Sequence, residues 1–297
     1  MKLELFIEYL RTEKRYSHHT VTAYESDLRQ FYHFISEEYS INSPSQITRD
    51  MIRSWVYLLL EEEHLSSRSV NRKLSALKTY YRFLRKTDQQ LKSPLKQIVL
   101  PKTNKKLPQF VSKDEMMRLQ DETIFKKGFE GARDRFMITL LYYTGIRLEE
   151  LINIKTSDLD LSRMELKVMG KRNKERIIPL HKKVRIAALE YMNERIKRIE
   201  SPEASPAPLF ITIKGKPVYK RLVHRVVNEY LGKVSTLNKR SPHILRHTFA
   251  THMLNNGADL NAIKELLGHA NLAATQVYTH NSIDQLKNIY KNAHPRA

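Results

Sequence analysis

Apolar residues in the first 90 positions recur every three or four residues, which is the period of a helix with one buried face. Thr48 precedes one such segment, and Ser66 or Ser67 precedes another, in positions where a hydroxyl can cap a helix. We therefore expect four helices before residue 91, at about residues 3–10, 21–35, 48–59 and 66–84. The clearest inward stripes are Val21, Tyr24, Leu28, Phe31 and Ile35, and then Val70, Leu74, Leu77, Tyr81 and Leu84.

Residues 92–110 interrupt this pattern. They contain three prolines and five lysines without a helical period, which favours an extended linker between two domains. Directly afterwards, Ser112 and Glu115 have the spacing of a capping box, and the mostly apolar residues 131–143 predict a buried helix. A second domain is therefore expected after the linker.

The second domain also contains a β pattern. Two stretches in which apolar and polar residues alternate flank the turn sequence KRNK, and this arrangement predicts a hairpin. Two further helices are expected, separated by a loop rich in proline and serine. The strands are predicted at 164–170 and 175–180, the helices at 182–199 and 218–234, and the loop at 201–208. The whole pattern indicates a mainly α fold with a small β-sheet.

The charge balance points to a polyanionic partner. The chain has 52 Lys and Arg residues against 32 Asp and Glu residues, a formal net charge of +20. Residues 1–100 carry 16 basic and 12 acidic residues, whereas residues 101–297 carry 36 and 20, so the excess lies in the second part. Nucleic acid is the leading candidate, and the alternative is a soluble protein that is merely basic.

The expected fourth helix has a basic side as well as an apolar one. A basic face is commonly only solvated, but in a chain of this charge it is also a candidate for contacts with phosphates. The lysines of the linker, likewise, are either only solvated or in contact with phosphates. The residues that we place on the basic face are Arg68, Arg72, Lys73 and Arg82.

Several classes of protein are disfavoured. The chain has no cysteine, which excludes disulfides and thiolate chemistry and suits the cytoplasm. Its first residues carry charges within the apolar pattern, unlike a signal peptide. The apolar run VYLLL is far too short to span a bilayer. We therefore expect a cytoplasmic protein that does not act in a membrane.

The stretch SPHILRHTFATHML, residues 241–254, carries a candidate phosphate site. Ser241 can cap a helix, and Pro242 suits its first turn. His243 then lies at the helix N-terminus, where backbone N–H groups favour an anion, and Arg246 lies one turn further on the same face. From its position we expect the helix dipole to disfavour a positive charge on this imidazole, which would leave it able to accept a proton.

His243 and His247 are four residues apart, which is also the spacing of two metal ligands on a helix. In the zincin motif, however, a glutamate follows the first histidine, and here Ile244 stands in that position. No acidic residue or cysteine nearby completes a metal site. We expect no metal, and we expect His247 to be a supporting residue that is hydrogen-bonded inside the domain.

The stretch YYTGIRLEELINI, residues 142–154, contributes a second arginine. Gly145 can end the preceding helix in a left-handed conformation, and Arg147 then starts the next helix. Glu150, three residues later, can orient Arg147, although the two can also form an ordinary surface ion pair. Two arginines beside one phosphate would stabilise the charge of a pentavalent phosphorane.

Two further residues have an ordinary and a chemical interpretation. Lys171, at the tip of the predicted hairpin, can donate a proton to a leaving oxygen or can simply be exposed. Gly268 can end a helix and place His269 at a helix junction. Tyr278 follows in LLGHANLAATQVYTH, where it can pack in a core or attack phosphorus as a nucleophile.

The motifs TGIRLEEL, GKRNKER, HILRH and GHANLAATQVYTH occur in this order. Together they resemble the tyrosine recombinase (phage-integrase-like) family, whose signature is Arg, Lys, His-x-x-Arg, His or Trp, and Tyr. The resemblance covers the whole chain, and the final AHPRA looks most like the bacterial Xer recombinases, which resolve chromosome dimers. It implies an N-terminal four-helix SAM-like core-binding domain (1–91), a linker (92–110) and an α+β catalytic domain (111–297).

The resemblance also implies a role for each motif residue. Arg147 and Arg246 would hold the scissile phosphate, and Lys171 would protonate the departing 5′ oxygen. His243 would assist proton transfer from the nucleophile, and His269 would donate a hydrogen bond to the phosphate.

In this scheme Tyr278 would attack the phosphate, giving a 3′-phosphotyrosyl link and a free 5′ hydroxyl. A 5′ hydroxyl of the partner duplex would then attack the link, and two successive strand exchanges would pass through a Holliday junction. Because the bond energy is retained in the covalent link, neither ATP nor a metal nor another cofactor is expected.

One position departs from the family pattern. The family usually has glycine after the lysine, whereas this chain has Arg172, and Asn173 can supply the turn conformation that glycine would allow. Arg172 and Lys174 are therefore candidates for DNA contacts, in addition to Arg68, Arg72 and Lys73 of the basic face.

The resemblance further implies an assembly on DNA. Four protomers would surround two dif-like sites, as a homotetramer or with a second Xer-type recombinase. A DNA translocase of the FtsK type is a further candidate partner, which would control the exchange. A last helix carrying Leu286, Ile289 and Tyr290 would dock on a neighbouring protomer, or else cover its own core. His280 gains no role and is expected at the surface. Such a protein would associate with the nucleoid.

Three other functions have the same fold or chemistry. An integrase or invertase of a mobile element would use the same chemistry and differ only in its target sites. A DNA-binding protein without cleavage would not need the complete set of motif residues. A type IB topoisomerase normally relaxes DNA without choosing a site or assembling a tetramer.

Overall fold

The computed structural model describes residues 2–89, 91–96, 98–102, 109–170, 174–198 and 207–268. The chain divides into two compact units, Met1–Lys106 and Leu107–Ala297, which are described separately below. Within the described residues, no helix is both long enough and apolar enough to cross a membrane.

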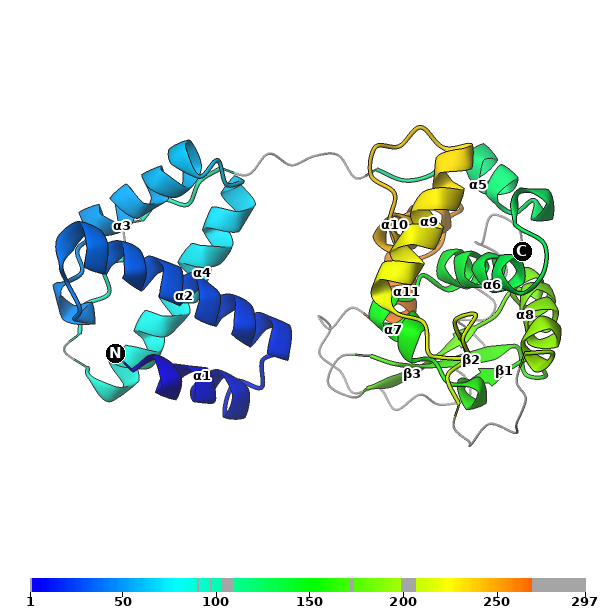
Figure 1. Ribbon diagram of the computed structural model, residues 1–297, viewed down its shortest axis with the longest axis horizontal. Coiled ribbons are helices and arrows are strands. Elements are labelled where there is room, and N and C mark those ends of the chain that lie inside the picture. Colours follow the sequence, from blue (N-terminus) through cyan, green and yellow to red (C-terminus); the bar gives the residue numbers. More distant parts are fainter. Residues whose placement is uncertain are drawn as a thin grey trace. The chain divides into compact units, whose positions relative to one another are not determined.

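The N-terminal unit is helical (Figure 1), and the two helices for which a cap was predicted, α3 and α4, begin there. Thr48 and Ser66 each accept a hydrogen bond from the backbone N–H three residues later, as predicted, and Ser17 does the same. The elements are α1 (Leu3–Thr12), α2 (His18–Tyr39), the 3₁₀ turn η1 (Pro44–Gln46), α3 (Arg49–Tyr57), its π-helical continuation η2 (Leu58–Glu62) and α4 (Ser67–Thr87).

The predicted apolar stripes form the core of this unit. Every inward residue predicted on α4 is buried, and on α2 only Tyr24 is half-exposed. Trp55 of α3 packs with its ring centroid 4.8 Å from that of Phe31 on α2, while Tyr80 of α4 lies against Phe6 of α1. All four main helices therefore share one aromatic core.

Our placement of Lys73 on an exposed basic face is wrong. Its side chain is buried, and its Nζ lies 3.0 Å from Oδ1 of Asp27 on α2. Lys73 comes three residues after Val70 and four before Leu77, so the helical period places it on the buried face. Burial next to a carboxylate removes it from the candidate DNA contacts.

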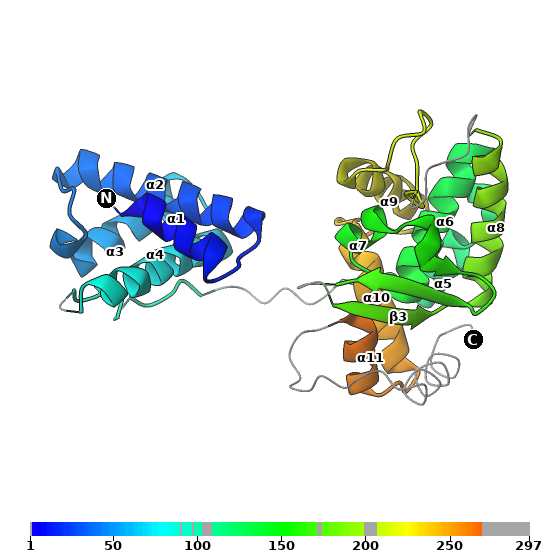
Figure 2. The same ribbon diagram turned by 90° about the horizontal axis from the view of Figure 1, so that it is seen from below.

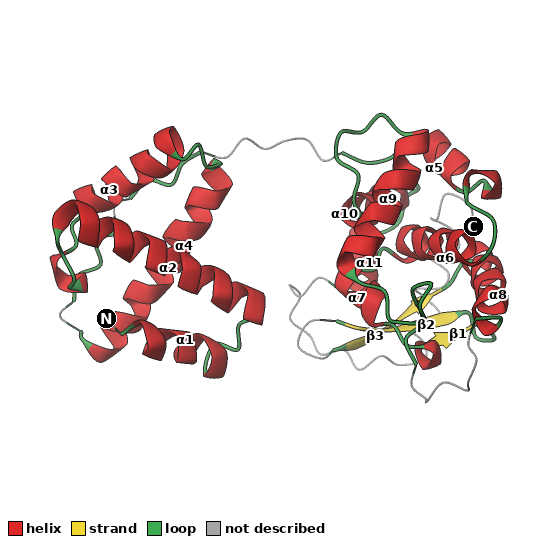
Figure 3. Ribbon diagram, in the orientation of Figure 1, coloured by secondary structure: helices red, strands yellow, loops and turns green. Residues whose placement is uncertain are grey.

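The C-terminal unit combines a small sheet with helices (Figure 3). The capping box of Ser112 and Glu115 is present, and the predicted helices and the two predicted strands lie within a few residues of their expected positions, whereas β1 and the 3₁₀ turns were not predicted. The helices are α5 (Lys113–Leu119), α6 (Phe129–Thr144), α7 (Leu148–Asn153), α8 (Lys182–Ile196), α9 (Lys220–Val234), α10 (Pro242–Asn255) and α11 (Leu260–Leu267), with 3₁₀ turns η3 (Glu122–Ile124) and η4 (Thr156–Asp158).

The sheet is antiparallel, in the order β1 (Leu159–Asp160), β2 (Glu165–Met169) and β3 (Glu175–Pro179). Leu166 pairs with Ile178, and Val168 pairs with Arg176. All four of these side chains are buried, so the strand alternation turns one charged residue toward the protein interior.

Helix α6 is buried along almost its whole length and ends at Gly145, as predicted. Gly145 has a left-handed φ of 60°, and a Cβ added to it would lie 2.5 Å from Phe249 of α10 and 2.7 Å from Leu267 of α11. Only glycine therefore allows α10 and α11 to approach the end of α6 this closely. Figure 2 shows α11 beside α10 in the same unit.

Candidate active site

His243 and Arg246 lie on the first turns of α10. Pro242 is the first residue of this helix, as expected, and His243 is exposed at its N-terminus. Ser241 occupies the N-cap, but its hydroxyl accepts no capping hydrogen bond from the described helix, so that part of the prediction is wrong. Arg246 is half-buried one turn after His243.

Arg147 is held at the start of α7 by Glu150. The Glu150 carboxylate accepts a 2.7 Å bond from the Arg147 backbone N–H and a 2.9 Å bond from its Nη1. The predicted orientation of the arginine by the glutamate is confirmed. Glu150 is buried, whereas about a quarter of the Arg147 side chain is exposed (24%), so the pair is not an ordinary surface ion pair.

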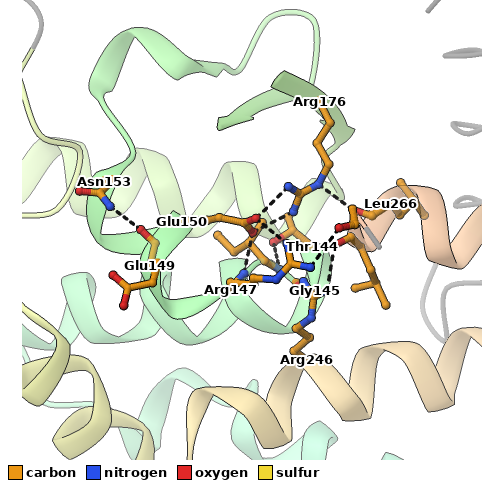
Figure 4. Close-up of polar contacts among 12 residues, drawn as sticks. Thr144, Gly145, Arg147, Glu149, Glu150, Asn153, Arg176, Arg246 and Leu266 are labelled. Carbon is orange, nitrogen blue, oxygen red and sulfur yellow. Dashed lines mark hydrogen bonds and ion pairs between the residues drawn. The ribbon is translucent and has the colours of Figure 1, made fainter. Parts of the chain in front are cut away.

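The two arginines meet at the C-terminal end of α11 (Figure 4). Nη2 of Arg246 donates to the Leu267 carbonyl at 2.8 Å, and Nη2 of Arg147 donates to the Gly268 carbonyl at 3.0 Å. Nη1 of Arg246 also donates to the Gly145 carbonyl at 2.5 Å. Guanidinium groups from two distant parts of the chain are therefore fixed on consecutive peptide units.

A third arginine, Arg176 of β3, belongs to the same site and was not anticipated. Its Nη1 and Nη2 donate to the two carboxylate oxygens of Glu150 at 2.9 and 2.8 Å, and its Nε donates to the Leu266 carbonyl at 2.9 Å. The sequence contains one signal for it. Arg176 stands two positions before Ile178 in an alternating strand, on the face that points inward.

We call Arg147, Arg176, Arg246 and Glu150 the arginine cluster. Burial raises the pKa of Glu150, but hydrogen bonds from Arg176 and from the Arg147 backbone outweigh burial and leave the pKa below its usual value. Burial, together with the nearby charge of Arg147, lowers the pKa of Arg246 to about 10. Three guanidinium groups and one carboxylate leave a positive excess, which favours an anion at this place.

Two further histidines of α10, His247 and His252, are less exposed than His243. His247 is half-buried, and His252 is buried with its Nδ1 3.0 Å from the Tyr142 hydroxyl of α6. Burial lowers the pKa of His252, which makes it a neutral core residue. Among the described residues there is no group of three or more His, Cys, Asp or Glu side chains that could hold a metal ion.

Other predicted residues lie at the surface. Arg68 and Arg72 are exposed on α4, and Arg72 forms an ion pair with Asp27. Lys174 is exposed, and its carbonyl accepts a 2.8 Å bond from the Gly170 N–H. The predicted residues outside the described part of the chain are Lys171, Arg172, Asn173, His269, Tyr278, His280, Leu286, Ile289 and Tyr290.

Comparison with known proteins places the chain in a family. The model of the phage integrase family matches residues 109–285, and the model of its N-terminal SAM-like domain matches residues 3–88. The chain is 41% identical to the tyrosine recombinase XerC of Staphylococcus haemolyticus (strain JCSC1435), over 98% of this chain and 96% of that protein. It is 38% identical to the tyrosine recombinase XerC of Chlorobaculum parvum (strain DSM 263 / NCIMB 8327), over 99% and 94%.

A solved structure has the same fold. The XerH site-specific recombinase bound to a palindromic difH substrate, in a post-cleavage complex, matches with a TM-score of 0.72 and 23% identity, over 97% of this chain and 82% of that chain. The two family models together cover both units, and the relatives match over nearly their full length. The chain therefore belongs to the phage integrase family and is a site-specific tyrosine recombinase, an enzyme that cuts and rejoins DNA.

Proposed function

We propose that this recombinase resolves chromosome dimers at a dif-like site in the cytoplasm, in association with the nucleoid. The proposal is supported by the relatives named XerC, which match over nearly the whole chain. Its partners would be double-stranded DNA and three further protomers, either identical or of a second Xer-type recombinase. A DNA translocase of the FtsK type would control when exchange occurs.

The arginine cluster carries the chemical part of the proposal. Arg147 and Arg246 approach consecutive carbonyls at 3.0 and 2.8 Å, although they lie on different helical segments. Three positive charges and one negative charge leave an excess of two, which matches the charge of a pentavalent phosphorane. Guanidinium groups also suit non-bridging phosphate oxygens, because the planar group presents parallel N–H donors that can bind two oxygens at once. A scissile phosphate bound here would relieve the repulsion between Arg147 and Arg246.

The remaining residues would complete a phosphoryl transfer in which the covalent link to tyrosine retains the energy of the broken phosphodiester bond. The Tyr278 oxygen forms a bond to phosphorus while the bond from phosphorus to the 5′ oxygen breaks. His243 accepts the tyrosine proton, and Lys171 supplies a proton to the leaving oxygen. His269 donates a hydrogen bond to the phosphate, and attack by another 5′ hydroxyl reverses these steps.

DNA contacts outside the catalytic centre would come from both units. Arg68 and Arg72 present charge on the exposed side of α4, and Lys174 follows the hairpin tip. Arg172 would add a further contact next to Lys171. Such contacts with the DNA backbone position the duplex without reading its sequence.

The chemical part is tested with a nicked suicide substrate, which traps the cleaved strand. We expect a covalent protein–DNA adduct that survives denaturation and is absent with Tyr278→Phe. Tyr57→Phe, which removes the hydroxyl of an exposed tyrosine in the N-terminal unit, should leave adduct formation unchanged. An undiminished adduct with Tyr278→Phe would refute the assignment of the nucleophile.

The proposed biological role is tested by finding the DNA site on which the protein acts. This site is obtained by mapping where the protein binds across its host genome. A single site near the replication terminus supports resolution of chromosome dimers. Sites at the ends of mobile or invertible segments would instead identify an integrase or invertase with the same chemistry.

A further inference from the structure

The guanidinium group of Arg176 is buried and closely surrounded by other residues. It is only 6% exposed, although it is an arginine on a strand at the edge of a small sheet. Two glycines lie against it, because a Cβ added at Gly268 would be 3.2 Å from its Nη1, and one added at Gly170 would be 3.4 Å away. A side chain at Gly268, whose φ is also positive, would crowd the planar group, and one at Gly170 would be in direct contact with it.

The guanidinium joins three segments that are distant in the chain. It binds both carboxylate oxygens of Glu150 at the start of α7, and it also binds the Leu266 carbonyl at the end of α11. Glu150 in turn binds the backbone and side chain of Arg147. Movement of Arg176 would therefore shift two parts of the site. These are Arg147, which we propose to face the phosphate, and the end of α11, to which Arg147 is hydrogen-bonded.

We infer that Arg176 is a positioning residue of the recombination reaction, which acts through Glu150 on Arg147 and through Leu266 on the end of α11. This inference rests on the proposed role of Arg147 in holding the scissile phosphate. Arg176 itself does not touch the reacting atoms. Its function is to keep Glu150 ionised and fixed, so that the guanidinium of Arg147 faces the phosphate in one orientation.

The fork shape of arginine matters for this role. Two parallel N–H groups bind the carboxylate, while Nε binds a carbonyl in a different direction. A lysine can supply the charge but not this set of directions. A glutamine supplies neither. The variants Arg176→Lys and Arg176→Gln therefore separate the effect of charge from the effect of geometry.

The test measures single-turnover formation of the covalent adduct, together with DNA affinity, in the full-length protein. We expect Arg176→Gln to slow cleavage by about 100-fold, because a small displacement of a catalytic group has an effect of this size. Cleavage by Arg176→Lys should be intermediate. The affinity for DNA should change much less than the rate, since the side chain of Arg176 is buried.

Arg133→Gln is the matched control. Arg133 is also a buried arginine, 2% exposed and paired with Asp134 at 2.8 Å, but it lies on the first turns of α6. Its replacement measures how much the cleavage rate falls when a buried ion pair of an arginine is lost elsewhere in the same unit. A merely structural Arg176 would give the same rate change in both variants.

The pH profile provides a readout that lost stability would not produce. Hydrogen bonds from Arg176 help to keep the pKa of Glu150 low, against the effect of burial. Among the residues that the structure describes, the other charged groups that face this carboxylate are Arg147 on its own segment and Arg246 of α10. In Arg176→Gln the carboxyl should gain a proton more easily, so cleavage should fall as the pH is lowered. Arg176→Lys should restore the flatter profile.

The outcomes separate two kinds of failure. If Arg176→Gln cleaves as fast as Arg133→Gln and keeps the wild-type pH profile, the positioning role is overturned while the proposed function stands. If the wild type forms no adduct that depends on Tyr278, the proposed function fails instead. If Arg176→Gln does not fold, Arg176→Lys decides: slowed cleavage with a wild-type pH profile supports the inference, and wild-type cleavage overturns it.

Discussion

Asp27 is a buried carboxylate that holds two cations of α4. It is 2% exposed, forms an ion pair with Arg72 and accepts a 3.0 Å bond from Nζ of Lys73. Nζ of Lys73 also donates to the side-chain oxygen of Gln30 at 2.5 Å. Buried charges of this kind are stable only while each has its partner. The group therefore joins α2 to α4 and fixes the guanidinium of Arg72, whose side chain remains partly exposed.

Replacement of the two partners should have unequal effects. Asp27→Asn leaves the buried ammonium of Lys73 without a counter-charge, and we expect it to lower the free energy of unfolding by about 3 kcal/mol. Lys73→Met leaves Asp27 paired with Arg72, and the loss should stay below about 1.5 kcal/mol. Urea unfolding followed by the fluorescence of Trp55, the single tryptophan of the chain, measures both. Equal losses would contradict this account.

Helix α11 is the element on which the candidate site depends. The carbonyls of Leu266, Leu267 and Gly268 each accept a hydrogen bond from a different arginine. The C-terminal carbonyls of a helix have no partner within it, and the helix dipole favours cations there. The end of α11 is thus stabilised by the same guanidinium groups that would bind phosphate. The approach of α10 and α11 to Gly145 makes this arrangement possible.

Gly145→Ala tests that approach. The new Cβ would meet Phe249 and Leu267 at 2.5 and 2.7 Å, and the backbone has a positive φ. We expect a loss of about 3 kcal/mol or more in the free energy of unfolding, because overpacking adds to backbone strain.

Gly215→Ala is the control for strain alone, since its φ is 72° and a Cβ there would meet nothing within 4 Å. It should lose about 1–2 kcal/mol. Far-UV circular dichroism during urea unfolding gives both values. If the two variants are equally stable, close packing at Gly145 is not what requires glycine.

At the scale of the whole molecule, charge is distributed unevenly along the chain. Residues 101–297 carry most of the excess of +20, although residues 1–100 supply the exposed arginines of α4. Binding to a polyanion by such a surface releases counterions from the DNA. Each arginine that contacts a phosphate therefore adds to the salt dependence of binding.

The salt dependence of DNA affinity should distinguish exposed from buried cations. The logarithm of the affinity falls as the logarithm of the salt concentration rises. Arg68→Gln should make this negative slope shallower by about 1, because one phosphate contact is lost. Lys73→Met should leave the slope unchanged, since the ammonium is buried against Asp27. Titration of duplex DNA at several salt concentrations gives the slopes. A shallower slope in Lys73→Met would show that this lysine contacts the DNA.

Local patterns in the sequence were sufficient to predict the main helices of both units and the two strands of the hairpin, but not β1. Helical period and capping residues placed α2, α4 and α6, because these signals act within a few residues of one another. The same reasoning placed Arg147 beside Glu150 and Arg246 one turn after His243. Lys73 was misplaced although its spacing from Val70 and Leu77 was informative, because a charged residue was assumed to be exposed.

The contacts that make the site depend on residues far apart in the chain. Arg176 and Glu150 are 26 positions apart, and Arg147 and Gly268 are 121 apart. Periodicity within one element does not predict which neighbour a buried side chain will meet, since that follows from the packing of β3, α7 and α11. The types of residue and their elements could thus be predicted from the chain alone. Their meeting around one carboxylate and one helix end was decided by the tertiary structure.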